Sequence, residues 1–154
     1  MNTDLSVAPE IAQLADPFVP PQHAAAVPRT DGRIAGALTE LAATPQRWWD
    51  LVRFDPAGPV RLPVPGEPGA WLLVLPPGTA VDCDCQQATA LAGEATEAPH
   101  EPVAGAPLGH GARPSPLRAG RVRVHGTGTP HRLRAVGPGY SVTLHIGDRR
   151  PRSA

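Results

Sequence analysis

Residues 60–85, VRLPVPGEPGAWLLVLPPGTAVDCDC, decide the fold class of this chain. Three short strand-like runs, at 60–64, 70–75 and 79–85, are each bounded by proline or glycine, which is typical of strands joined by tight turns. Four further runs extend the pattern: 88–97, 118–125, 130–136 and 140–146. Seven or eight short strands separated by turn residues predict a mainly β fold, a small double-sheet jelly roll or barrel.

A short helix is predicted ahead of these strands. Ile34, Leu38 and Leu41 follow the i, i+4, i+7 spacing of one helical face. Thr30 or Asp31 is suited to cap the first turn, because a short polar side chain accepts a hydrogen bond from a free backbone N–H. We therefore expect one amphipathic helix packed against the sheet.

Pro45 ends the predicted helix, and the pair Trp48 and Trp49 follows it closely. Aromatic residues make up only 4% of the chain, so two adjacent tryptophans are a notable concentration of apolar surface. We interpret the pair as a hydrophobic plug that docks the helix onto the sheet. The alternative is that the two rings stack on a ligand.

The chain has 154 residues, enough for one domain, and contains 21 Pro and 16 Gly. Residues 29–147 are predicted to form this domain, and residues 1–28 and 148–154 to form flexible tails. Within the domain, residues 98–116 are rich in proline and glycine and are predicted to be a long loop insert.

The charge pattern restricts the classes of partner. Arginine supplies all 14 basic charges, and 14 acidic residues balance them. A neutral chain without a basic cluster argues against a nucleic-acid-binding protein. The sequence offers neither a signal-peptide pattern nor an apolar stretch long enough to span a bilayer, so we expect no membrane partner and a cytoplasmic location. Cysteines there are expected to stay reduced or to bind a ligand.

Cys83 and Cys85 lie two residues apart on a predicted strand, so their side chains are expected on one face, with Asp82 and Asp84 on the other. Their Cα atoms would be roughly 6.6 Å apart, at the far limit for an unstrained disulfide. A shared metal fits this spacing more easily. With His131 the two thiolates would make a three-ligand site with an open position. Alternatively, the two thiols are small buried apolar groups.

Several stretches of the chain resemble bacterial cysteine dioxygenase-type cupins. They are LAATPQRWWDLVRFD at 41–55, RAGRVRV at 118–124, the turn at 126–131 and the run at 140–145, and the likeness extends over residues 39–146. The resemblance implies a small cupin barrel with a short N-terminal helical segment. It also implies an enzyme that uses Fe(II) to add O₂ to the thiol of a small thiol carboxylate such as cysteine.

The family's functional residues can be placed on this sequence one by one. The family binds iron with a His-x-His pair and a later histidine, and the matching positions are Cys83, Cys85 and His131. Arg61 matches the arginine that binds the substrate carboxylate. Thr143 and His145 match the serine and histidine of an outer Ser-x-His-x-Tyr network, whose tyrosine is replaced by glycine here.

Two departures from the family pattern bear on activity. Two thiolates in place of two imidazoles add negative charge, which raises the cost of binding a third thiolate from substrate. Softer ligands also favour Zn²⁺ or Cu(I) over Fe(II). In addition, the segment between Cys85 and the Gly-Glu-x-Thr-Glu turn at 93–97 is about four residues shorter than in the family, an even number that preserves the inward and outward alternation.

Three functions therefore remain open from the sequence. The first is a thiol dioxygenase with its metal at Cys83, Cys85 and His131. The second is a cupin that binds zinc or copper without oxygenating thiols, and the third is a pseudoenzyme that holds no metal and serves as a binding or scaffold module. His125 replaces an aromatic residue of the family pattern and is expected in the core or at the barrel rim.

Overall fold

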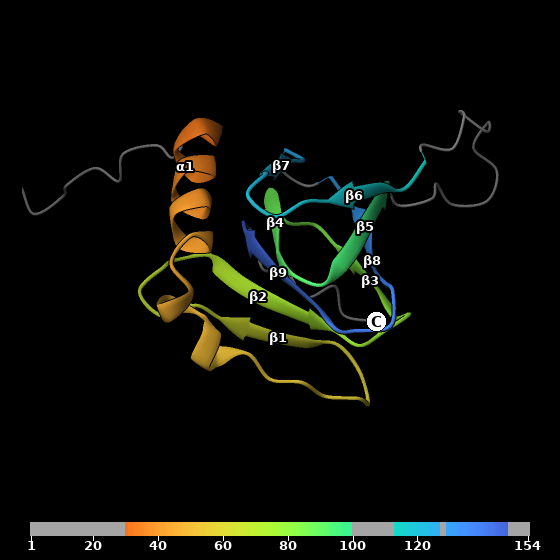
Figure 1. The fold of residues 1–154 in the computed structure, drawn as a ribbon. Helices are drawn as coiled ribbons and strands as arrows, with labels where there is room; N and C mark the ends of the chain where they lie inside the picture. Colours follow the sequence, from red (N-terminus) through yellow and green to blue (C-terminus); the bar gives the residue numbers. More distant parts are fainter. Residues whose placement is uncertain (1–29, 100–112, 127–128, 148–154) are drawn as a thin grey trace, which may run out of the picture.

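The computed structural model describes residues 30–99, 113–126 and 129–147. These residues form α1 (Asp31–Ala42), the 3₁₀ helices η2 (Pro45–Arg47) and η3 (Trp49–Leu51), and the strands β1 (Val60–Pro63), β2 (Ala70–Leu75), β3 (Ala80–Cys83), β4 (Gln87–Ala92), β5 (Glu94–Pro99), β6 (Ser115–Leu117), β7 (Arg123–Val124), β8 (His131–Val136) and β9 (Ser141–Ile146) (Figure 1). The mainly β fold class is thereby confirmed. None of the described helices is long and apolar enough to cross a membrane.

The strands form two sheets. One has the order β1-β2-β9-β4-β7 and the other the order β3-β8-β5-β6. Strands β2 to β5 alternate between the two sheets, and the last two strands, β8 and β9, return to the interior of one sheet each. Eight antiparallel strands, β2 to β9, arranged in this way make a double-sheet jelly roll, which is the architecture of cupins. The predicted barrel is therefore confirmed by strand order.

Strand β2 is buried on both of its faces. Ala70, Leu72 and Val74 pack with the helix, whereas Trp71, Leu73 and Leu75 fill the barrel interior. A strand covered on both sides has no polar face, which explains why AWLLVL is apolar throughout. The five-stranded sheet thus lies between two cores.

Helix α1 covers the outer face of the five-stranded sheet (Figure 1). Ile34, Leu38 and Leu41 are its buried residues, as the spacing predicted. Thr30 is the cap, since its hydroxyl accepts a bond from the backbone N–H of Arg33. The helix contacts β4 and β9, whose opposite faces point into the barrel.

The predicted tryptophan plug consists of one tryptophan. Trp48 is 5% exposed, packs in the helix-side core and donates from Nε1 to the carbonyl of Leu41 at 3.1 Å. Trp49 is 54% exposed and contacts the edge of the Trp48 ring. Trp48 lies between η2 and η3 and Trp49 is the first residue of η3, and of these two neighbouring side chains only that of Trp48 enters the core.

The predicted limits of two strands were wrong. Residues 88–97 form two strands, β4 and β5, because Gly93 adopts φ +70° and reverses the chain. Within 118–125 only β7 is a strand. The neighbouring strand β6 contains Pro116, which the sequence prediction placed in a loop; proline is tolerated there because β6 is at the edge of its sheet.

The predicted loop insert at 98–116 lies mostly outside the described residues. At its start, Ala98 and Pro99 belong to β5, and at its end Ser115 and Pro116 belong to β6. Residues 100–112 and the predicted tails at 1–28 and 148–154 are not among the described residues.

Replacement of Trp48 by alanine should lower the free energy of unfolding by about 3–5 kcal/mol, because a buried indole leaves a cavity against the helix. The matched control is Trp49→Ala, which should cost about 0.5 kcal/mol since that ring is mostly solvent-exposed. Urea unfolding of both variants measures the difference. Equal losses would show that the two rings share the docking role.

Gly93→Ala should be far more destabilising than Gly120→Ala. Both glycines have φ near +70°, so both substitutions carry the strain of a left-handed residue, about 1–2 kcal/mol. Of these two glycines, only at Gly93 would the new Cβ collide with backbone, namely the carbonyl oxygen of Tyr140, whereas nothing lies within 4 Å at Gly120. Thermal unfolding of the two variants tests this, and equal shifts would contradict it.

Candidate metal centre

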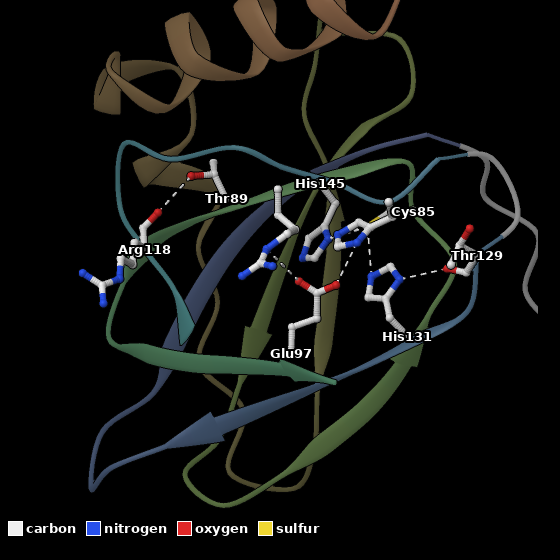
Figure 2. A network of polar contacts seen from close by, with 9 residues as sticks. Cys85, Thr89, Glu97, Arg118, Thr129, His131 and His145 are labelled. Atoms are coloured by element: carbon white, nitrogen blue, oxygen red, sulfur yellow. Dashed lines mark hydrogen bonds and ion pairs between the residues drawn. The ribbon is translucent and has the colours of Figure 1, made fainter. Parts of the chain in front are cut away.

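The candidate site lies inside the barrel, between the two sheets (Figure 2). Cys83 ends β3 and is the direct cross-strand partner of His131, the first residue of β8. Cys85 follows two residues later. His145 projects from β9 in the opposite sheet, where Trp71 and Ala88 are its cross-strand partners. Four residues from three separate segments of the chain therefore meet in one interior cluster.

Burial follows the expected alternation along the cysteine segment. Cys83 and Cys85 are buried, Asp82 is exposed and Asp84 is half-buried. Strand β3 ends at Cys83, so Cys85 reaches inward from the segment that leads to β4. The relative exposure of the four cluster residues, Cys83, Cys85, His131 and His145, lies between 0% and 4%. The site is thus removed from solvent.

The sulfur and nitrogen atoms of the cluster converge. The Sγ atom of Cys85 is 3.4 Å from Nε2 of His131 and 3.2 Å from Nδ1 of His145. The Sγ atom of Cys83 is 3.9 Å from the same Nδ1. Cys83, Cys85 and His131 place their ligand atoms within 4.8 Å of one another, and both cysteines are free thiols. The three ligands proposed from sequence are therefore brought together.

Each imidazole is held by its other nitrogen. Nδ1 of His131 lies 3.0 Å from the carbonyl of Thr129, which only accepts, so Nδ1 carries the hydrogen and Nε2 faces the sulfurs. The Thr143 hydroxyl lies 3.4 Å from the carbonyl of Leu73, to which it donates, and it accepts from Nε2–H of His145 at 2.7 Å. Nδ1 of His145 therefore presents its lone pair to the cysteines. Such anchoring of the far nitrogen is typical of histidines that bind metals.

The two cysteines have very different pKa values. A hydrogen bond from the Cys85 thiol lowers the pKa of Cys83 to about 2, against the opposing effect of burial. The same bond, with burial, raises the pKa of Cys85. Cys83 is therefore the thiolate of the metal-free pair and Cys85 the thiol.

The two histidines differ in charge. Burial is the largest single effect and would lower the pKa of His131, but the hydrogen bond to the Cys83 sulfur, the bond to the Thr129 carbonyl and the negative charges of Cys83 and Glu97 together outweigh it, and the pKa is raised. Burial lowers the pKa of His145, which therefore stays neutral. The metal-free cluster thus pairs a Cys83 thiolate with a cationic His131 at slightly acidic pH.

The donor set can be compared with the iron site that the resemblance implies. Two thiolates and an imidazole are donors that Zn²⁺ and Cu(I) accept, whereas the family's ferrous site uses three imidazoles. The described residues thus fit a metal ion, and they fit a soft or borderline one better than Fe(II).

Arg61, expected to bind a substrate carboxylate, lies on β1 with its guanidinium 4.8 Å from the centre of the Trp71 ring. It also donates to the carbonyl of Asp82 at 3.1 Å. The Trp71 ring in turn stacks on His145 at 4.2 Å between ring centres. Arg61 therefore adjoins the cluster by way of Trp71, a contact that sequence reasoning did not anticipate.

Glu97 lies next to the four-residue cluster and was not predicted from the sequence. It is buried on β5 and points toward the histidines (Figure 2). Its Oε1 lies 2.8 Å from Nδ1 of His125, and the His125 ring stacks on His131 at 3.9 Å. Glu97, His125 and His131 also place ligand atoms within 4.8 Å of one another. If residues 94–99 are recognised as a separate strand, alternation places Ala95 and Glu97 on the same buried face, and this could have identified Glu97 from the sequence.

No protein-family model matches this chain, and no curated protein matches it. Solved structures do resemble it. A protein from Thermus thermophilus is 20% identical, with 64% of this chain and 91% of that chain covered and a TM-score of 0.48. A cupin superfamily protein from Desulfitobacterium hafniense is 12% identical, with 66% and 89% covered and a TM-score of 0.45. An RmlC-like cupin from Desulfovibrio desulfuricans is 20% identical, with 62% and 88% covered and a TM-score of 0.42. At these identities the likeness concerns the fold alone.

The metal-free protein should contain one cysteine thiolate at about pH 6, where an ordinary thiol is protonated. The lowered pKa of Cys83 places its ionisation far below this pH, so the thiolate should persist from about pH 4 to pH 7 and disappear on unfolding. Ultraviolet thiolate absorbance measures it. Cys83→Ser should abolish the signal. A signal that first develops between about pH 8 and 9, as for a free thiol, would contradict the assignment.

Proposed function

We propose that this protein is a cupin-type barrel that binds one soft or borderline metal ion, Zn²⁺ in the first place, through Cys83, Cys85 and His131. The observation that carries the proposal is the convergence of two sulfurs and an oriented imidazole nitrogen within 4.8 Å in a buried site. Bound Zn²⁺ would supply two positive charges that neutralise the two thiolates.

The chemistry of the surroundings supports a metal site over a pair of inert thiols. Buried cysteines that merely fill space need no polar neighbours. Here two imidazoles, each fixed through its far nitrogen, face the sulfurs inside a barrel whose core is formed mainly by leucine and alanine together with Trp71. Burying such polar groups costs free energy unless a partner satisfies them, and a cation satisfies all of them together.

The identity of the ion follows from ligand softness. Thiolates select Zn²⁺ and Cu(I), whereas oxygen-rich sites select Mg²⁺ or Mn²⁺. Zn²⁺ with two thiolates and neutral imidazoles leaves the buried cluster without net charge, while Cu(I) would leave one negative charge in a low-dielectric interior. We therefore place Zn²⁺ before Cu(I).

The second candidate is a thiol dioxygenase that uses Fe(II) and a small thiol carboxylate such as cysteine. The 2.7 Å bond between Thr143 and His145 favours it, since it matches the outer network of the resembling family. In that reaction Arg61 would bind the substrate carboxylate. Against it stand the burial of all four cluster residues and the stacking of Trp71 on His145.

Metal analysis of the purified protein distinguishes the candidates. We expect close to one zinc per chain, and loss of this zinc in the double variant Cys83→Ser/Cys85→Ser, because serine hydroxyls are poor ligands for Zn²⁺. Iron in place of zinc, together with O₂ uptake on addition of cysteine or 3-mercaptopropionate, would support the dioxygenase. Failure to retain any metal after reconstitution with Zn²⁺ would leave the barrel as a metal-free module and refute the proposal.

Arg61→Ala is the matched control for this experiment. Arg61 lies outside the donor set, so its loss should leave the zinc content unchanged. If the protein oxidises thiols, however, the same substitution should raise the Michaelis constant for thiol carboxylates, because the carboxylate loses its cation. One variant thus separates metal binding from substrate binding.

A further inference from the structure

We infer that His145 is a fourth metal ligand, through Nδ1, so that the centre is closed by two cysteines and two histidines and ties the two sheets together. The inference rests on the proposed metal binding. It assigns to His145 a role other than the outer-network role that the family resemblance implies. Its basis is the geometry of His145 relative to the sulfurs.

The distances from the two sulfurs to the histidine nitrogens are close to the sulfur–nitrogen edge of a tetrahedral site. With a metal–sulfur bond of about 2.3 Å and a metal–nitrogen bond of about 2.0 Å, tetrahedral geometry separates sulfur from nitrogen by roughly 3.5 Å. His131 meets this value with 3.4 Å to Cys85. His145 lies 3.2 Å from Cys85 and 3.9 Å from Cys83, on either side of the same value. Its distances to both sulfurs thus suit a ligand, while the convergent set within 4.8 Å consists of Cys83, Cys85 and His131, so His145 would move closer to the other ligands when the metal binds.

The orientation of the ring supports the same role. Because the Thr143 hydroxyl accepts from Nε2–H, the nitrogen of His145 that carries a lone pair is the one nearest both sulfurs. The Trp71 ring lies parallel to the imidazole, within 12°, and limits its rotation. A histidine serving only as an outer hydrogen-bond donor would direct an N–H toward the metal-bound group. His145 presents a lone pair there instead.

A closed centre has structural consequences. Cys83 and His131 belong to the four-stranded sheet, whereas His145 belongs to the five-stranded sheet. A metal bound to all of them would join the inner faces of both sheets across the barrel. Four protein ligands leave no position for O₂ or a substrate thiolate, which is the pattern of structural rather than catalytic zinc sites.

X-ray absorption spectroscopy of the zinc-loaded full-length protein tests the inference. We expect two sulfur ligands and two imidazoles, the latter counted from the scattering of their ring carbons. His145→Ala should remove one imidazole and weaken zinc binding by at least about 100-fold, more than the loss of a residue that merely orients a ligand. A wild-type centre with two sulfurs and one imidazole, unchanged by His145→Ala, would overturn the inference and leave the proposed function intact. Absence of sulfur ligands would overturn both.

Two more variants keep the test decisive. If His145→Ala does not fold, His145→Cys retains a ligand of similar reach, and three sulfurs are expected around the zinc; two sulfurs would overturn the inference. Thr143→Val is the matched control, because it removes the hydroxyl that orients His145 and keeps the imidazole. It should weaken zinc binding by about 10–100-fold while leaving two sulfurs and two imidazoles.

Discussion

The packing of β9 between β2 and β4 is the constraint on which the rest of the structure depends. Alternate residues of this strand face opposite ways: Val142, Leu144 and Ile146 join the core beneath α1, and Thr143 and His145 enter the barrel. The same strand therefore docks the helix and supplies a polar pair to the interior. A shift of register by one residue would exchange the two sets, placing polar groups under the helix and removing them from the site.

The interior polar cluster is the least ordinary feature of this small barrel. Jelly-roll interiors are filled mainly by apolar side chains, and here Leu73, Leu75 and Leu133 conform to that rule. Four ionisable side chains among them carry a desolvation cost that a metal ion would offset, since its charge replaces the lost water. The closed ligand set that we propose also accounts for two thiolates at positions where the resembling enzymes have imidazoles. Thiolates are usual ligands of structural zinc sites, which have four protein ligands and no open position. A zinc ion bound in this way would cross-link the two sheets.

Local patterns predicted much of the fold. The helix was predicted because its three apolar residues repeat on one face, and β2 was predicted with its observed limits because proline and glycine bound it. The hairpin at Gly93 was missed because a lone glycine within an apolar run does not reveal the sign of its φ angle. Strand β6 was missed because the tolerance of Pro116 depends on its place at a sheet edge, which only the assembled sheet defines.

For the site, the sequence by itself determined that Cys83 and Cys85 share a face, because alternation along an extended chain needs no other element. The resemblance to a known family added His131, and it assigned Arg61 and His145 roles that depend on an open site. Only the tertiary structure decided that His145 faces the sulfurs with its lone pair and that Trp71 lies against it. The physical reason is that these contacts join residues 60 or more positions apart. The Trp71 contact exists only once β2 has paired with β9, and the contacts with the sulfurs exist only once the two sheets have packed.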